Sequence, residues 1–177
     1  PLTCAESLVL VRAAKAKGLP ISCSTAPQYF CLNELEVQDY RSYAKLNPPL
    51  RAEDDRNAVA KAVADGTIDC IVSDHCPQDV DAKRVPFEQA AFGMVGLETL
   101  LSMSLTLFHN EQIDLHALLA TLTYKTADLL GINAGRLKIG NAADLLVRDL
   151  DRPLRLQNTQ LRGKSKNAPL QGFPAQG

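Results

Sequence analysis

The 177-residue sequence lacks the features of several large protein classes. It has no run near the roughly 18 consecutive apolar residues that a membrane-spanning helix needs, and no basic segment leads into an apolar one at its start. The formal net charge is −1, which argues against capture of nucleic acid or of an anionic membrane surface. There is no internal repeat. We therefore expect a cytoplasmic protein with neither nucleic acid nor membrane as a partner.

Residues that bind metals or form disulfides are also scarce. Only three histidines are present, His75, His109 and His116, which limits the metal chemistry that this chain performs alone. The five cysteines are an odd number without a C-x-x-C pair, so the sequence indicates neither a disulfide framework nor a zinc ribbon. We expect the cysteines to be small buried apolar side chains in a reducing compartment.

The residues that are present form a clear helical pattern, and 46% of them are hydrophobic, enough for an ordinary domain. A capping box of Thr3 and Glu6 predicts the start of the first helix. Strands that alternate with helices are typical of parallel β-α-β units, although two such strands alone do not make a buried sheet. Helices are predicted over 4–17, 52–65, 97–109, 114–122 and about 124–130, and strands over 19–24 and 67–73.

Long segments without helical periodicity separate these elements. Residues 25–51 and 74–96 read as loops, with Asn33 as a cap for a short helical turn in the first of them. Residues 143–148 are strand-like because they are apolar and follow a turn. The tail 152–177 has no period, so we expect it to be irregular.

Asp74 is the first candidate for chemistry, because it directly follows the strand 67–73. Function concentrates at the carboxyl ends of strands in β/α architectures. A carboxylate in that place is able to bind a metal or to act as a general base. The alternative is an Asx turn that caps the start of the loop, and the residues alone do not separate the two.

The loops hold weaker candidates. Two prolines stiffen the loop 47–51, which helps Asn47 to present its amide to a ligand, although the residues alone slightly favour a rigid lead into the helix 52–65. Gly93 and Gly96 allow close approach of a ligand or simply a flexible loop. We expect Lys83 and Arg84 to be a solvated pair. We expect His109 and His116 to be surface or packing residues.

Several stretches together carry a pattern in a fixed order. They are Lys45–Arg51, Asp65–Pro77, Lys83 with Pro86–Phe87, Phe92–Thr99, Gly140–Leu145 and Gly163–Pro169. In turn they resemble the K-x-N-P-P-L-R loop, the D-G-T-I-D-x-I-x-[ST]-D-H-A-P strand and loop, the K…P-F pair, the F-G-I-V-G-x-E-T stretch, the G-x-x-A-D-[LI] run and the S-K-N-[ST]-P tail of the dihydroorotase family. This family is part of the amidohydrolase superfamily.

The resemblance implies a fold class, an α/β protein with a (β/α)₈ TIM barrel and a small β domain. Such a barrel typically needs about 250 residues. Residues 1–134 would be the C-terminal part of the barrel, from the end of the sixth strand onward, and 135–177 part of a β-sandwich. The chain would then leave strand edges unpaired unless other copies in an oligomer or the missing part of the barrel cover them.

The resemblance also implies a chemistry, the interconversion of N-carbamoyl-aspartate and dihydroorotate in pyrimidine biosynthesis, usually with zinc. Asp74 would be both a metal ligand and the residue that shuttles a proton. Asn47, Gln78 and the Phe92-Gly93 backbone match positions that contact the small-molecule substrate.

Departures from the family pattern favour a second hypothesis. Pro1 stands where the family has a histidine ligand, and Gln28 and Gln78 also replace histidines. A catalytic metal generally takes at least three protein ligands, which Asp74 alone does not supply, so we expect this chain alone to be inactive. Some members of the family have lost ligands and serve as structural partners of aspartate transcarbamoylase, which is the alternative function.

Overall fold

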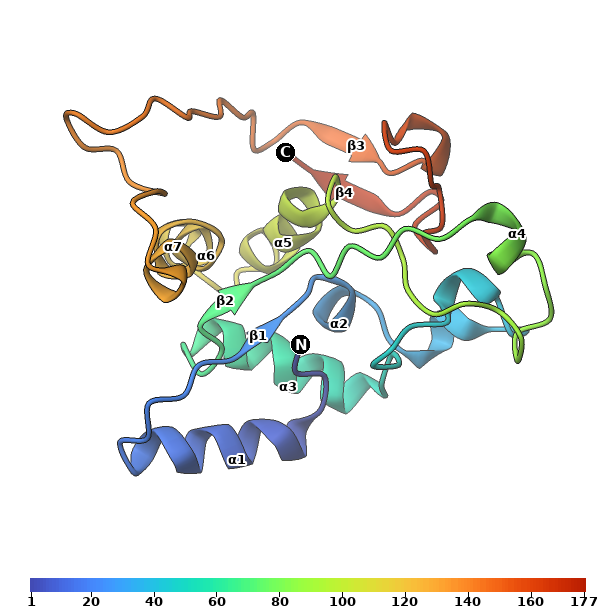
Figure 1. Ribbon diagram of the computed structural model, residues 1–177, viewed down its shortest axis with the longest axis horizontal. Coiled ribbons are helices and arrows are strands. Elements are labelled where there is room, and N and C mark those ends of the chain that lie inside the picture. The colour runs from blue at the N-terminus through green and yellow to red at the C-terminus, as the bar shows by residue number, and fades with distance from the viewer.

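Two short parallel strands lie at the centre of the molecule, with α1 and α3 below them and α5, α6 and α7 above them in the view of Figure 1. The computed structural model describes residues 1–177. The helices are α1 (Ala5–Ala16), α2 (Gln28–Cys31), α3 (Glu53–Ala64), α4 (Val80–Lys83), α5 (Leu100–His109), α6 (Leu115–Leu122) and α7 (Tyr124–Leu130). The strands are β1 (Ser24–Thr25), β2 (Cys70–Ile71), β3 (Pro153–Arg155) and β4 (Pro174–Gln176). The 3₁₀ turns are η1 (Glu34–Val37), η2 (Ser42–Ala44) and η3 (Asn158–Gln160).

The predicted helices are confirmed, with one correction at the start of α1. Cys4, not Thr3, occupies the N-cap, and its side chain makes no capping bond, so the capping box is wrong. The carboxylate of Asp55 in α3 accepts a hydrogen bond from the Ala5 amide at 2.8 Å instead. A residue of the neighbouring helix α3 therefore accepts the hydrogen bond from a free amide at the start of α1, where the local sequence was expected to supply the cap.

Other helix ends follow the local sequence. The Asp114 carboxylate accepts from the amides of His116 and Ala117 at the start of α6. Gly131 ends α7 in the left-handed conformation, with φ 68°, and Asn33 caps η1 by accepting from the Leu35 amide. None of the helices combines the length and the apolar character needed to cross a membrane.

The two central strands are shorter than predicted, although they pair as a β-α-β unit should. Ser24 lies opposite Cys70 and Thr25 opposite Ile71, in parallel register. Hydrogen bonds from Asp69 N to Cys23 O (3.0 Å) and from Val72 N to Thr25 O (2.8 Å) extend this ladder by one step at each end. The predicted strand 19–24 lacks a partner over its first half, where Leu19 and Ile21 are exposed. The chain has two separate two-stranded sheets, so it does not close a barrel.

Two apolar clusters hold this arrangement together. The first packs α1, α3, α5 and α6 against the end of β2 through buried side chains that include Leu8, Val59, Ile71, Leu105 and Leu118. The second lies under the loops that follow β1 and β2 and includes Leu46, Leu50, Met94, Met103 and Leu170. The loops at the carboxyl ends of the strands thus have a core of their own.

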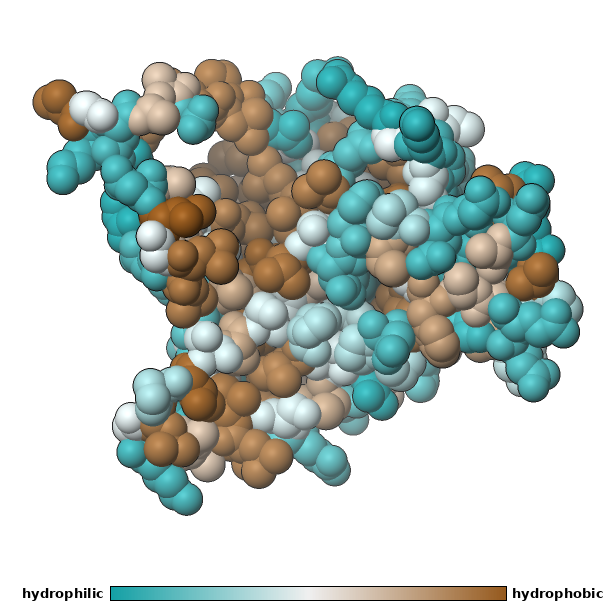
Figure 2. Space-filling view, viewed as in Figure 1, coloured by the Kyte–Doolittle hydropathy of each residue, from teal (hydrophilic) through white to brown (hydrophobic).

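The C-terminal part differs from its prediction in two places. Residues 143–148 form no strand, and they belong to an extended arm (132–149) that projects from the body (Figure 1). Most of the arm is exposed, including Leu137, Ile139 and Val147, and Figure 2 shows apolar surface on it. The tail, expected to be irregular, contributes β3 and β4, which pair antiparallel with Leu154 opposite Ala175 and pack on α5.

Candidate functional site

The carboxyl ends of β1 and β2 lead into two loop segments, 26–51 and 74–96, which we call the rim loops (Figure 1). Asp74 stands at the start of the second segment, half-buried, with φ 46°. Its Oδ2 accepts hydrogen bonds from Gln28 Nε2 (2.9 Å) and Tyr29 Oη (3.1 Å). No backbone amide donates to this carboxylate, so the Asx turn considered as an alternative does not form.

Gln28 and Tyr29 are nearly fully buried, at 1% and 3% exposed. Burial, and then the negative charge of Asp74, raise the pKa of the Tyr29 hydroxyl, which therefore keeps its proton and remains a donor. The same hydroxyl lies 3.0 Å from the carbonyl oxygen of Pro48. Tyr29 thus joins Asp74 to the loop that carries Asn47.

The Asn47 side chain is exposed and makes no hydrogen bond within the chain, so it is free to meet a ligand. Its loop is held from below by buried Leu46 and Leu50. The carbonyl of Lys45 accepts a hydrogen bond from the Gly93 amide at 3.0 Å, which joins the two rim loops. Asp74, Asn47 and Gly93 therefore belong to one connected surface.

Asn167 is the main residue of the rim that sequence reasoning missed as a site residue. It is 2% exposed, and its Nδ2 donates to the carbonyls of Cys76 and Gly93, both at 3.1 Å. Its Oδ1 accepts from the Gln78 amide (3.1 Å) and from the hydroxyl of Ser165. One buried side chain from the tail thus fixes both halves of the loop 74–96. The S-K-N-[ST]-P pattern was the only sequence signal for it.

Gly93 is required for packing between chain segments. Its φ is 106°, and an added Cβ would lie 2.5 Å from the Cys76 Sγ. The close approach expected of this glycine is therefore to Cys76. All five cysteines are free, but the expectation that they are buried holds fully only for Cys70, since Cys76 is exposed and the other three are half-buried.

The remaining predicted positions lie around this turn. Gln78 is half-buried and its Nε2 donates to the Cys76 Sγ at 3.2 Å. The Phe92 ring is 52% exposed, with the Lys45 ammonium 4.6 Å from its centroid. Lys83 was expected to be solvated, but it is 1% exposed, which corrects that prediction.

The side chains of this chain do not by themselves fit a catalytic metal. No group of three His, Cys, Asp or Glu side chains is placed to hold one. His75 is next to Asp74, but its Nδ1 accepts from the amides of Gly96 (3.2 Å) and Leu97 (3.3 Å). His116 is on the surface of α6. Asp74 follows β2 and could supply a single carboxylate ligand, which is too few for a catalytic metal.

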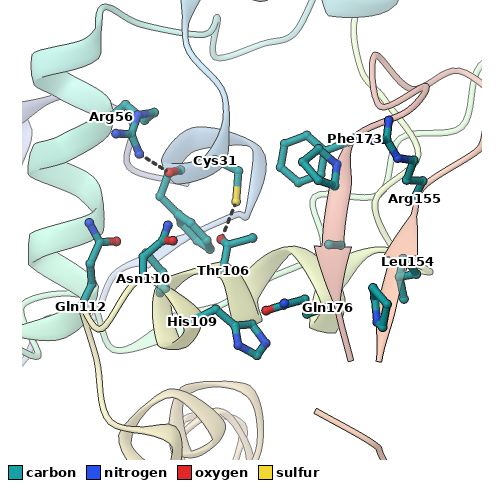
Figure 3. A pocket seen from close by; sticks show the side chains of 15 residues that line it. Cys31, Arg56, Thr106, His109, Asn110, Gln112, Leu154, Arg155, Phe173 and Gln176 are labelled. Carbon is teal, nitrogen blue, oxygen red and sulfur yellow. Dashed lines mark hydrogen bonds between the residues drawn. The ribbon is translucent and has the colours of Figure 1, made fainter. Parts of the chain in front are cut away.

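A second cavity of about 580 Å³ lies between α5 and the β3–β4 pair (Figure 3), and Phe30 and Cys31 at the end of α2 line part of it. His109 lines it, and the buried Nε2 of this residue has no hydrogen-bond partner. The Cys31 thiol meets Thr106 Oγ1 at 3.2 Å, and burial raises its pKa to about 12. Arg56 is already paired with Glu53 at 2.6 Å. Because its polar groups are mostly paired or inert, the rim remains the better candidate.

Comparison with known proteins gives the family of the chain. A family model described as "Amidohydrolase family" matches residues 3–174, so the chain belongs to the amidohydrolase family. Within that family the chain is dihydroorotase-like. It is 44% identical over 172 residues to the dihydroorotase of Ehrlichia chaffeensis, covering 97% of this chain and 38% of the relative. It is 43% identical over 176 residues to that of Desulforapulum autotrophicum, covering 99% and 41%. The chain thus spans about two fifths of the length of these relatives.

Solved structures confirm the predicted fold class. The L-hydantoinase (dihydropyrimidinase) from Arthrobacter aurescens matches with a TM-score of 0.92 and 30% identity, over 99% of this chain and 40% of that one. A D-hydantoinase from a Thermus species matches with a TM-score of 0.91 at 24% identity, over the same shares, which bears on the fold alone. The chain has the fold of a portion of a TIM-barrel amidohydrolase.

Proposed function

We propose that the whole protein is a cytoplasmic cyclic amidohydrolase that interconverts N-carbamoyl-aspartate and dihydroorotate in pyrimidine biosynthesis. The observation that carries the proposal is the likeness to dihydroorotases along nearly the whole chain, together with Asp74 at the carboxyl end of β2. The rim offers the polar groups that a small ligand needs. Residues 1–134 and 135–177 correspond, in this proposal, to barrel and small β domain.

Asp74 supplies the proton transfer in this proposal. In hydrolysis, water adds to the ring carbonyl carbon and the ring C–N bond breaks. Asp74 takes a proton from the attacking water and returns it to the leaving nitrogen. Gln28 and Tyr29 hold one carboxylate oxygen in place, which leaves Oδ1 for the reacting groups. Asn47, Gln78 and the Phe92-Gly93 turn bind the substrate.

Zinc belongs to the proposal only for the whole protein, because the residues of this chain do not complete a site. A metal in such enzymes polarises a carbonyl and activates water. No step of the chemistry assigned to these residues depends on it.

A direct assay tests the proposal. The whole protein, with zinc supplied, is expected to hydrolyse dihydroorotate at ordinary enzyme rates of roughly 1–10³ s⁻¹. The 177-residue chain alone is the matched control and is expected to be inactive. Absence of turnover by a folded, zinc-loaded whole protein would contradict the enzyme proposal.

A second candidate function is that of a non-catalytic dihydroorotase homologue, a structural partner of aspartate transcarbamoylase. Its supporting observation is that neutral donors, Gln28 and Tyr29, occupy Asp74 Oδ2 and need no metal to do so. Mixing the whole protein with aspartate transcarbamoylase and looking for co-elution tests this candidate. Turnover in the assay above, or the absence of a complex, excludes it.

A further inference from the structure

Lys83 is an unusual residue, a lysine that is almost completely buried without a carboxylate partner. Its side chain is 1% exposed, and it forms no salt bridge in the chain. Lysines are almost never fully buried unless they are paired, because desolvation of the charge is costly. The chain tolerates this cost within the second rim loop, at the end of α4.

Both hydrogen bonds that the Lys83 ammonium donates go to backbone carbonyls. It donates to Ser42 O at 3.0 Å and to Lys45 O at 3.2 Å, at the two ends of η2. The Ser42 hydroxyl in turn donates to the carbonyl of Lys83. Lys45 O also accepts from the Gly93 amide. One side chain at the end of α4 therefore ties together both rim loops, just before Asn47 and at Gly93.

We infer that Lys83 is a positioning residue, which sets the distance between the Asn47 loop and the Gly93 turn by bracketing the carbonyls of Ser42 and Lys45. That these loops face a substrate rests on the proposed function. The hydrogen bonds from Lys83 to the carbonyls of Ser42 and Lys45 do not rest on it, because they are contacts within the chain.

The charge of Lys83 provides a readout that a purely space-filling residue lacks. Burial lowers its pKa from 10.5 to about 8, with Cys76 raising it and Lys45 lowering it further. If the loops open, the ammonium returns to water and to its ordinary pKa. Between about pH 8 and 10.5 the open state therefore binds more protons than the closed one. Raising the pH through this window favours the closed loops.

Residue-resolved amide hydrogen exchange on the 177-residue chain tests the inference. Lys83→Met keeps the approximate shape but removes one of the two donors of each carbonyl, because Ser42 O and Lys45 O keep only the amides of Lys45 and Gly93. We expect the Lys45 and Gly93 amides to exchange about tenfold faster, because two hydrogen bonds from a charged donor are lost. Lys61→Met, at an exposed lysine of α3, is the matched control and should change nothing. Unchanged exchange of both rim amides in Lys83→Met would overturn the inference.

Two further measurements test the inference even if Lys83→Met does not fold. Ser42→Ala removes only the hydroxyl that returns to Lys83 O, and it should speed exchange of the same amides by a few-fold. In the wild type, the protection factors of these amides should rise roughly fivefold to tenfold from pH 7.5 to pH 9, after correction for intrinsic exchange. A flat profile contradicts the inference. Neither readout uses catalytic activity, so failure here is distinct from failure of the proposed function.

Discussion

The rim loops and the arm are both long segments with little regular secondary structure, and they differ in how their backbones are held. The rim loops are fixed by buried side chains that bond to main-chain atoms, as Asn167 and Lys83 do. The arm 132–149 has few such bonds, and its apolar residues Leu137, Ile139 and Val147 face outward. Figure 2 shows this apolar surface beside the more hydrophilic rim side.

The comparison shows what order in a loop requires. In a segment outside helices and sheets, side chains must provide hydrogen bonds to the backbone N–H and C=O groups. Those side chains must be buried for the hydrogen bonds to persist. The rim meets both conditions and is therefore suited to hold catalytic groups in fixed positions. The arm meets neither in this chain, although its sequence is as apolar as that of a strand.

The largest expected effect comes from breaking the close contact under the rim at Gly96. A Cβ at this position would lie 2.2 Å from the carbonyl oxygen of Ser73, so Gly96→Ala forces the backbone apart. We expect a loss of about 3 kcal/mol in the free energy of unfolding, measured by urea denaturation. Gly163→Ala is the matched control, since its Cβ would lie no closer than 3.4 Å to any neighbouring atom, the nearest being in the Glu98 side chain. Equal losses for the two variants would contradict this explanation.

Removal of the Asn167 side chain should have a smaller effect on the same region. Asn167→Ala leaves the carbonyls of Cys76 and Gly93 without a donor, which costs about 2 kcal/mol. Asn141→Ala, in the arm, removes a long bond of 3.4 Å at an exposed carbonyl and should be nearly neutral. Thermal or urea denaturation of both variants checks the difference. If the rim variant is as stable as the arm variant, the bonds of Asn167 do not hold the loop.

The smallest effect is expected in the arm itself. Val147 is 95% exposed, so Val147→Ser should change the free energy of unfolding by less than about 0.5 kcal/mol. The same change should reduce self-association at high concentration, because it removes exposed apolar surface. Sedimentation velocity measures this, with Val59→Ser in the buried core as a destabilising control. A large loss of stability in Val147→Ser would show that the arm is packed.

The helices could be predicted closely because their signals are local. Asp114 and Gly131 bound their helices as expected, since caps and left-handed glycines act within one turn. Thr3 failed because a distant residue, Asp55, supplied the bond. Strands were predicted less well, because a strand needs a partner that the local sequence does not reveal. Residues 143–148 have none, whereas β3 and β4, each beginning with proline, find one another across the tail.

The site could be predicted only in outline. Asp74 was chosen as a candidate because it directly follows the predicted strand 67–73, which is a local signal. Its partners Gln28 and Tyr29 are 46 and 45 residues away. Before the structure, Gln28 was noted only as a departure from a family pattern, and Tyr29 was not singled out. Their position after β1, parallel to β2, was the available signal, since parallel strands end at one edge. Lys83 could not be found in this way, because nothing local distinguishes a buried lysine from a solvated one.

The most direct test compares one aspartate from each region in the whole protein, assayed for dihydroorotate hydrolysis. Asp74→Asn should lower kcat by about 10²–10⁴-fold, because the amide does not take up a proton. Asp144→Asn, on the exposed arm, should leave kcat within about twofold of the wild type. Wild-type turnover by Asp74→Asn would contradict the assignment of the rim as the active site.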